Sequence, residues 1–273
     1  MFSQPLNLTA LNSLLNTKVI GKSPGWANEI FDSIESTNNR AIELANKAAP
    51  EGVIVAARQQ TAGKGRLGRV WVSPPDTGLY ISFILRSRLA RPMVPIMSFA
   101  AGTAAVEAIE ETAGVRVGLK WVNDIVFGGR KLGGILAEMT DGGKAVVIGI
   151  GINLKEPDSE PWPPEVAAVA TTIESITSAP IDANQLAASL AKRLEIRYQQ
   201  LETGDLPGSI DRWREFCVTL GKPIRATVGD KIIEGTAYDV ASDGALMVRL
   251  HHGELTTLHA GDVSIRNADG SYS

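Results

Sequence analysis

Short apolar runs with many β-branched residues are the feature that most restricts how this chain can fold. Two of them, Gly52–Arg58 and Gly78–Arg86, have the length and composition of buried strands. Three more follow at Val115–Trp121, Leu132–Met139 and Lys144–Ile152. Strands this apolar must be covered, so we expect a sheet with helices packed against it.

Stretches with helical spacing lie between and around these runs. Residues 36–49 begin with a serine that can cap a helix, and apolar residues recur at near-helical intervals over Met93–Ala113. Asp182–Leu201 is a second long pattern, and Ser209–Phe216 is a short one. A further short helix is expected around Leu6–Leu15. Together these patterns predict an α+β fold with a mixed sheet.

The sequence pattern changes beyond Gly221, where the strand-like segments become short and closely spaced. Glycine and aspartate pairs separate them, as expected for tight turns. Five segments can be distinguished: 223–228, 231–239, 245–250, 254–259 and 262–266. Short strands joined by turns are typical of a small β-barrel. We therefore expect two domains, residues 1–218 and residues 219–273.

Composition excludes several classes of protein. The chain has 27 Lys and Arg against 30 Asp and Glu and a formal net charge of −3, so it lacks the basicity of a typical DNA-binding domain. A single cysteine, Cys217, excludes an internal disulfide framework and a multi-cysteine zinc site. The N-terminus lacks the basic start of a secretory signal, and polar residues interrupt the most apolar stretch, Val94–Ile109. We expect a cytoplasmic protein without a membrane segment.

Histidine occurs only near the C-terminus. Because His251, His252 and His259 are the only three, the larger domain has no Ser–His or Cys–His pair and no HExxH zinc motif. If that domain is an enzyme, cations and backbone amides have to support its chemistry.

The segment Gln60–Trp71 is the most informative stretch for function. It combines three cations and three glycines with no acidic residue: Lys64, Arg66 and Arg69, and Gly63, Gly65 and Gly68. Glycines let the backbone approach an anion, and clustered cations repel one another unless a negative ligand joins them. The alternative is a solvated basic turn.

The same glycines match the G-x-G-x-x-G pattern of dinucleotide-binding folds and kinase loops, but the required contexts are missing. The segment continues as Trp71-Val-Ser-Pro-Pro, which cannot open a helix. The H-R-D and D-F-G strings of kinases do not occur in the chain. Both of these interpretations are therefore rejected.

This segment resembles the signature of the biotin protein ligase family, G-R-G-R-x-G-R-x-W, and reads Gly63-Lys-Gly-Arg-Leu-Gly-Arg-Val-Trp71. Four further blocks resemble family motifs in the family's order: Glu35-Ser-Thr-Asn38, Lys120-Trp-Val-Asn-Asp124, Lys131-Leu-Gly-Gly-Ile-Leu-Ala-Glu138 and Gly149-Ile-Gly-Ile-Asn153. Lys64 stands where the family usually has arginine, and Val122 where it has proline. The resemblance extends from residue 33 to the C-terminus.

The resemblance implies a class II synthetase-like catalytic fold with a small SH3-like β-barrel at the C-terminus. It implies an ATP-dependent, AMP-forming ligase that uses Mg²⁺, converts biotin to biotinyl-5′-AMP and transfers biotin to a lysine of a biotin carboxyl carrier protein. Lipoate ligases and octanoyltransferases share the fold and remain an alternative. A broader alternative is a non-enzymatic module that binds a small anion or nucleic acid. Both a monomer and a homodimer are compatible with the sequence.

The resemblance also implies residue roles. Arg66 and Lys131 would hold the biotin carboxylate and the acyl phosphate, and Lys120 would add charge near the α-phosphate. The remaining biotin contacts would be Ser36, Thr37, Asn38, Gln60, Lys64 and Gly65. The nucleotide contacts would be Arg69, Trp71, Lys120, Asn123 and Asn153.

Asp124 would orient the acceptor lysine or accept its proton. Its alternative roles are a contact to Mg²⁺ and an ion pair with Lys120. Three other residues have purely structural alternatives, with Ser36 as a helix cap, Trp71 as an anchor of the loop to the core and Lys131 as a solvated side chain.

Some family members carry an N-terminal winged helix-turn-helix and act as repressors. Only 35 residues precede Ser36, which is too few for three helices and a wing. We therefore expect a monofunctional ligase without specific DNA binding. We also expect residues 63–70 to be poorly ordered without ligand and to fold over bound adenylate.

Overall fold

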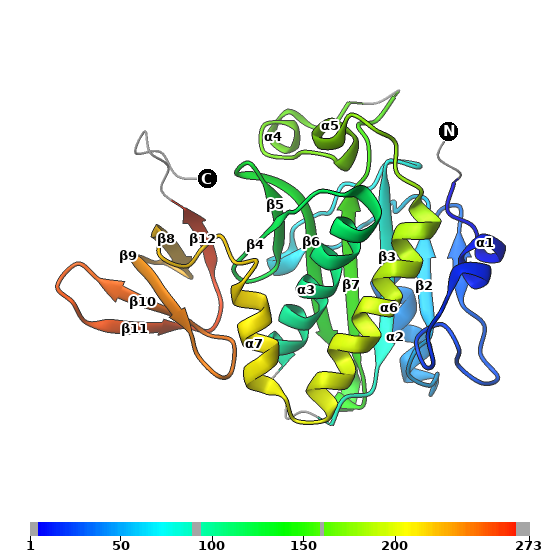
Figure 1. Ribbon diagram of the computed structural model, residues 1–273, viewed down its shortest axis with the longest axis horizontal. Coiled ribbons are helices and arrows are strands. Elements are labelled where there is room, and N and C mark those ends of the chain that lie inside the picture. Colours follow the sequence, from blue (N-terminus) through cyan, green and yellow to red (C-terminus); the bar gives the residue numbers. More distant parts are fainter. Residues whose placement is uncertain (1–4, 89–93, 159–160, 266–273) are drawn as a thin grey trace.

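The computed structural model describes residues 5–88, 94–158 and 161–265. A seven-stranded sheet forms the larger part and a five-stranded sheet follows it (Figure 1). The strands of the larger sheet are β1 (Glu29–Phe31), β2 (Ile54–Ala57), β3 (Gly78–Leu85), β4 (Gly118–Lys120), β5 (Asp124–Phe127), β6 (Arg130–Met139) and β7 (Val146–Asn153). Their order is β1-β2-β3-β7-β6-β5-β4, with β1 parallel to β2 and the other pairs antiparallel. The predicted mixed sheet is confirmed.

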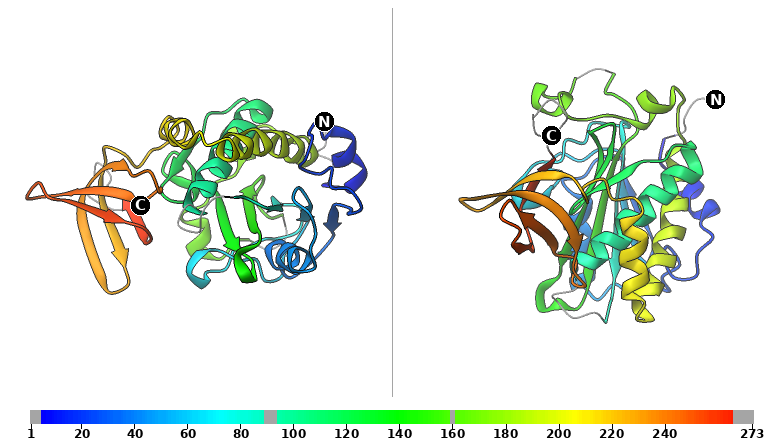
Figure 2. Two further views of the ribbon diagram at one scale, coloured as in Figure 1. Left: turned by 90° about the horizontal axis from the view of Figure 1, so that it is seen from below. Right: turned by 60° about the vertical axis from the view of Figure 1, so that its left-hand side comes forward.

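Helices cover both faces of this sheet. The α-helices of the described ranges are α1 (Leu8–Leu14), α2 (Thr37–Asn46), α3 (Val94–Ala113), α4 (Pro164–Ala167), α5 (Ile173–Thr177), α6 (Ala183–Glu202) and α7 (Leu206–Arg214). Helices α3, α6 and α7 lie on one face and α2 on the other (Figure 2). No helix in the described ranges is both long and apolar enough to cross a membrane.

The hydrophobic core lies between the sheet and the layer of α3 and α6. The long apolar pattern predicted for α3 is buried, with Phe99 stacked on Trp213 of α7 at 4.0 Å between ring centroids. Burying side chains of this size stabilises the fold by about 2–3 kcal/mol each. Glu107 interrupts this apolar surface and is paired with Arg197 at 2.5 Å and Arg212 at 2.7 Å.

The C-terminal part is an antiparallel sheet in the order β11-β10-β9-β8-β12. Its strands are β8 (Pro223–Val228), β9 (Lys231–Val240), β10 (Leu246–Leu250), β11 (Leu255–Leu258) and β12 (Asp262–Ile265). The five predicted strands are therefore present, although Arg266 lies outside the described residues. The predicted barrel is not closed, because β11 and β12 are the two edges of the sheet within the described ranges.

Several element boundaries differ from the sequence-based expectation. The run Val115–Trp121 contains only the three-residue strand β4, and β1 and β5 were not predicted at all. Both of the missed strands are short and lack the continuous apolar run that marks β3 and β7. Helix α7 begins at Leu206 rather than Ser209, because the side chain of Asp205 caps it by accepting from the Gly208 amide. Met93, the expected start of α3, lies outside the described residues.

Candidate active site

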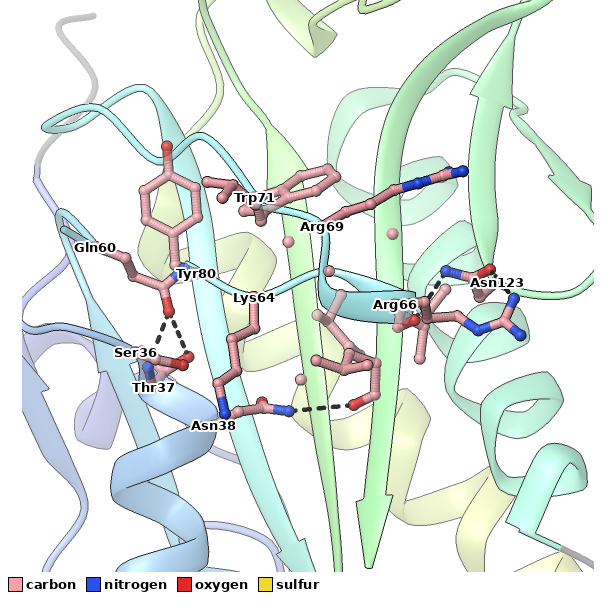
Figure 3. A pocket seen from close by; sticks show the side chains of 18 of the residues that line it. Ser36, Thr37, Asn38, Gln60, Lys64, Arg66, Arg69, Trp71, Tyr80 and Asn123 are labelled. Atoms are coloured by element: carbon pink, nitrogen blue, oxygen red, sulfur yellow. Dashed lines mark hydrogen bonds between the residues drawn. The ribbon is translucent and has the colours of Figure 1, made fainter. Parts of the chain in front are cut away.

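A cavity of about 140 Å³ lies on the side of the larger sheet that carries α2. Its wall combines the start of α2, the loop 60–71 and strands β3, β5, β6 and β7 (Figure 3). Asp262 of β12 in the C-terminal sheet also contributes. Twelve of the fourteen predicted site residues line it: Ser36, Thr37, Asn38, Gln60, Lys64, Gly65, Arg66, Arg69, Trp71, Asn123, Asp124 and Lys131. Since Gly149, Ile150 and Gly151 also line the cavity, residues from five distant motifs meet in one place.

The loop 60–71 folds back on itself as a narrow hairpin above this cavity. The amide of Gly65 donates to the Arg69 carbonyl at 2.7 Å, and the amide of Trp71 donates to the Gly63 carbonyl at 2.8 Å. The apolar side chains of Leu67 and Val70 remain 69% and 74% exposed. The three cations of the hairpin, Lys64, Arg66 and Arg69, line the cavity. The expected disorder of this loop without ligand stays a prediction.

One end of the cavity is formed by the start of α2. Ser36 caps the helix by accepting from the Asn39 amide at 3.4 Å, and it also lines the cavity. Gln60 reaches across from the loop, and its Oε1 accepts from the Thr37 amide at 2.8 Å and the Thr37 hydroxyl at 3.1 Å (Figure 3). Because Gln60 satisfies a free helix amide, it joins the loop to α2.

Two glycines of the last motif allow side chains to lie flat on the sheet. A Cβ at Gly151 would lie 2.6 Å from the indole of Trp71, and a Cβ at Gly149 would lie 2.1 Å from Oδ1 of Asn38. Trp71 therefore both anchors the loop and forms a wall of the cavity. Its indole nitrogen is buried and has no hydrogen-bond partner within the described ranges.

An ion pair and an amide occupy the other end of the cavity. Nζ of Lys131 lies 2.7 Å from Oδ1 of Asp124 and 5.5 Å from the centre of the Trp71 ring. Arg66 donates to Oδ1 of Asn123 at 3.0 Å, and Asn123 in turn donates to the Ile135 carbonyl at 3.1 Å. Lys131 is thus held in the site rather than extended into solvent.

Burial changes the electrostatics of this end. It lowers the pKa of the Arg66 guanidinium, while the charge of Asp124 and that of Asp262 oppose the shift. Four cations line the cavity against these two carboxylates: Lys64, Arg66, Arg69 and Lys131. Fixed positive charge in a partly buried site is suited to bringing anionic groups together.

The sequence did not predict that the C-terminal sheet contributes to the cavity. Asp262 of β12 lines it and forms an ion pair with Arg69 of the loop. No local motif marks Asp262, which reaches the loop only through the packing of the two sheets. Tyr80 was also missed, because it lies inside an apolar run that indicated only a buried strand.

Two predicted site residues lie beside the cavity rather than in its wall. Asn153 donates to the carbonyls of Thr171 and Lys131 at 3.1 and 3.4 Å, so its amide holds backbone segments together. Lys120 pairs in register with Asp124 and lines a neighbouring cleft. Burial lowers the pKa of Lys120, the charge of Asp124 opposes this, and Lys131 adds to it. The nucleotide contacts expected of both residues stay predictions.

Comparison with known proteins relates this site to one family. Residues 30–154 match the biotin/lipoate A/B protein ligase family, and residues 219–266 match the biotin protein ligase C-terminal domain. The bifunctional ligase/repressor BirA of Bacillus subtilis is 33% identical over 254 residues, which cover 92% of this chain and 76% of BirA. The biotin–[acetyl-CoA-carboxylase] ligase of Mycobacterium tuberculosis is 31% identical, with coverage of 91% and 93%.

A solved structure shows the same fold. The biotin protein ligase from Aquifex aeolicus in complex with biotin and ATP superposes with a TM-score of 0.77 and 26% identity, over 89% of this chain and 100% of that one. Sequence and structure therefore agree on one assignment, and the chain belongs to the biotin protein ligases of the biotin/lipoate A/B protein ligase family.

Proposed function

We propose that this chain is an ATP-dependent, AMP-forming biotin–protein ligase. It activates biotin as biotinyl-5′-AMP and transfers the biotinyl group to a lysine of a biotin carboxyl carrier protein. The observation that supports this most strongly is the cavity itself, in which four cations and the polar start of α2 face a single space. The names of the relatives, including ligases for acetyl-CoA carboxylase, agree with this substrate and partner.

The first step joins two anions. A carboxylate oxygen of biotin attacks the α-phosphorus of ATP, the bond to the β-phosphate breaks, and pyrophosphate leaves with the electron pair. The nucleophile is already ionised, so the step needs positioning and positive charge rather than a general base. Arg66 and Lys131 hold the carboxylate and the acyl phosphate in this proposal, and Arg69 and Lys120 add charge on the nucleotide side.

The two ends of the cavity serve different parts of the substrates. The biotin ring lies against Ser36, Thr37, Asn38 and Gln60 at the start of α2, with Lys64 and Gly65 closing over it. Trp71 and Asn123 lie at the nucleotide end. Asn153 supports this end through the backbone of Lys131.

The second step transfers the acyl group to an amine. A protonated lysine is not a nucleophile, so it must lose a proton before its nitrogen attacks the acyl carbon and AMP leaves. Asp124 is the carboxylate proposed to orient this amine or accept its proton. Its ion pair with Lys131, the residue proposed to hold the acyl phosphate, supports this proposal.

Mg²⁺ is proposed to enter with ATP. Magnesium is usually held by substrate phosphates, water and one or two carboxylates. Asp124 and Asp262 are the two carboxylates among the residues that line the cavity, and either could supply such a ligand. Since ATP is a substrate, the proposed reaction also agrees with a cytoplasmic location.

Exchange of labelled pyrophosphate into ATP tests the proposed activation step. Exchange that depends on biotin, but not on lipoate or on protein alone, is the expected result. Exchange with lipoate would favour the lipoate ligase alternative, and binding of biotin or ATP without exchange would favour a non-enzymatic module. A gel shift tests the expectation of no specific DNA binding, and light scattering distinguishes a monomer from a homodimer.

A further inference from the structure

Ser82 is a buried hydroxyl that the proposed reaction does not use. It lies on β3 two residues after Tyr80, and therefore on the same face of the sheet, with no exposed surface. Its Oγ lies 2.6 Å from Oδ1 of Asn38 and 2.8 Å from Oγ1 of Thr37. Ser82 thus contacts two neighbouring residues that line the cavity, although it does not line the cavity itself.

Glu138 contacts Asn38 from the opposite side. Nδ2 of Asn38 donates to the Glu138 carboxylate at 2.8 Å and to the Leu136 carbonyl at 3.4 Å. Glu138 ends the motif that begins at Lys131, and the proposed chemistry gives its carboxylate no role. It lies on β6, so Asn38 spans the sheet from β3 to β6 above Gly149 of β7.

These contacts permit only one orientation of the Asn38 amide. An ionised carboxylate and a backbone carbonyl can only accept hydrogen bonds, so the amide nitrogen must face Glu138 and Leu136. The amide oxygen then faces the Ser82 hydroxyl, which donates to it. Turning the amide over would place its oxygen against two acceptors, which is unfavourable.

The fixed orientation determines what Asn38 offers to a ligand. Both amide hydrogens are engaged, whereas Oδ1 receives one hydrogen bond and keeps a second lone pair. Because Asn38 lines the cavity, a ligand N–H group that reaches Oδ1 can be accepted there, whereas the amide has no hydrogen left to donate. The cyclic urea of biotin carries N–H groups, and the dithiolane ring of lipoate carries none.

We infer that Ser82 and Glu138 are positioning residues for recognition of the biotin ring, acting through the Asn38 amide. The inference rests on the proposed function and extends it, since it identifies residues outside the cavity wall that set which hydrogen bonds the ring can make. Neither residue touches the reacting atoms, so their loss weakens ring binding rather than the chemical step.

The test measures biotin-dependent pyrophosphate exchange and separates the KM for biotin, the KM for ATP and kcat. In S82A and E138A the KM for biotin is expected to rise about tenfold, the equivalent of one buried hydrogen bond, with kcat and the KM for ATP within about twofold. E138Q keeps an acceptor oxygen for Asn38 and is expected to recover most of the affinity for biotin.

A matched control is available in the layer of α3 and α6. Ser189 donates to the Glu111 carboxylate at 2.9 Å, a serine side-chain hydrogen bond on the opposite face of the sheet. S189A should leave the KM for biotin unchanged, even if its thermal unfolding midpoint falls. If S82A does not fold, E138A and E138Q still provide the comparison.

The experiment distinguishes a failure of the proposed function from a failure of this inference. Wild-type protein without biotin-dependent exchange would overturn the proposed function. Wild-type exchange with an unchanged KM for biotin in S82A and E138A would overturn this inference alone. So would a parallel change of kcat and both KM values together with a lower unfolding midpoint, because that pattern indicates a general structural defect.

Discussion

The ammonium of Lys131 and the carboxylate of Asp124 form an ion pair of 2.7 Å between neighbouring strands of the larger sheet. In the proposed mechanism an acyl phosphate competes with Asp124 for this ammonium. When the ligand takes over Lys131, Asp124 is released at the place where the acceptor amine must lose a proton. The pair therefore connects the two half-reactions.

Replacing Asp124 should impair the second half-reaction, transfer, and leave the first, activation, largely unchanged. D124N keeps a side chain of the same shape but removes the basic oxygen, so we expect transfer to a carrier domain to fall at least 100-fold, the range of general-base contributions. Pyrophosphate exchange should stay within about threefold. Both rates can be measured on one preparation. Transfer at the wild-type rate would exclude Asp124 as the base.

Alanine substitutions at the two strand glycines should affect different substrates. G151A places a Cβ against the Trp71 indole and should raise the KM for ATP, whereas G149A displaces Asn38 and should raise the KM for biotin. Displacing a packed side chain by this much costs about 1–3 kcal/mol, or roughly 5- to 150-fold. The two variants serve as controls for each other. Equal effects on both substrates would contradict the assignment of the two ends of the cavity.

The loop should become resistant to protease when the adenylate is bound. Lys64, Arg66 and Arg69 are trypsin sites in residues 63–70, and ligand contacts to these side chains should close the hairpin over the cavity. We expect cleavage in this segment to slow at least tenfold with biotin and ATP together, as judged by mass spectrometry of the fragments. Cleavage outside the loop provides the control. Equal cleavage with and without both substrates would argue against closure.

Lys120 should give the activation step a dependence on alkaline pH. Burial lowers its pKa below the ordinary 10.5, so the ammonium is charged below the folded pKa and becomes neutral as the pH rises through it. If this charge assists the α-phosphate, exchange falls with rising pH over that window. K120R keeps its charge and should flatten this decline. Identical profiles for the wild type and K120R would remove Lys120 from this role.

The sequence predicted the parts of the fold that depend on local pattern. The capped start of α2, the apolar length of α3 and the buried strands β3 and β7 follow from capping, periodicity and burial within single segments. The strands β1 and β5 depend on their neighbours in the sheet and were missed. Whether the C-terminal sheet closes could not be predicted, since short strands and turns do not determine it.

The candidate site, like the fold, could be predicted only where it depends on local sequence. Residues within motifs could be identified because their types and spacing are visible along the chain, and twelve of them line one cavity. Asp262, Tyr80 and Ser82 could not be identified, because each comes to lie at or beside the cavity only when distant segments of the chain are brought together. The roles of the glycines became clear only once Trp71 and Asn38 were seen lying on them.

A crystal structure with a non-hydrolysable analogue of biotinyl-5′-AMP tests the proposed reaction most directly. We expect the phosphoryl group to lie within hydrogen-bond distance of Arg66 and Lys131, with the ring at the start of α2 and the adenine toward Trp71. An analogue bound elsewhere, with Lys64, Arg66 and Arg69 directed into solvent, would contradict the proposed function.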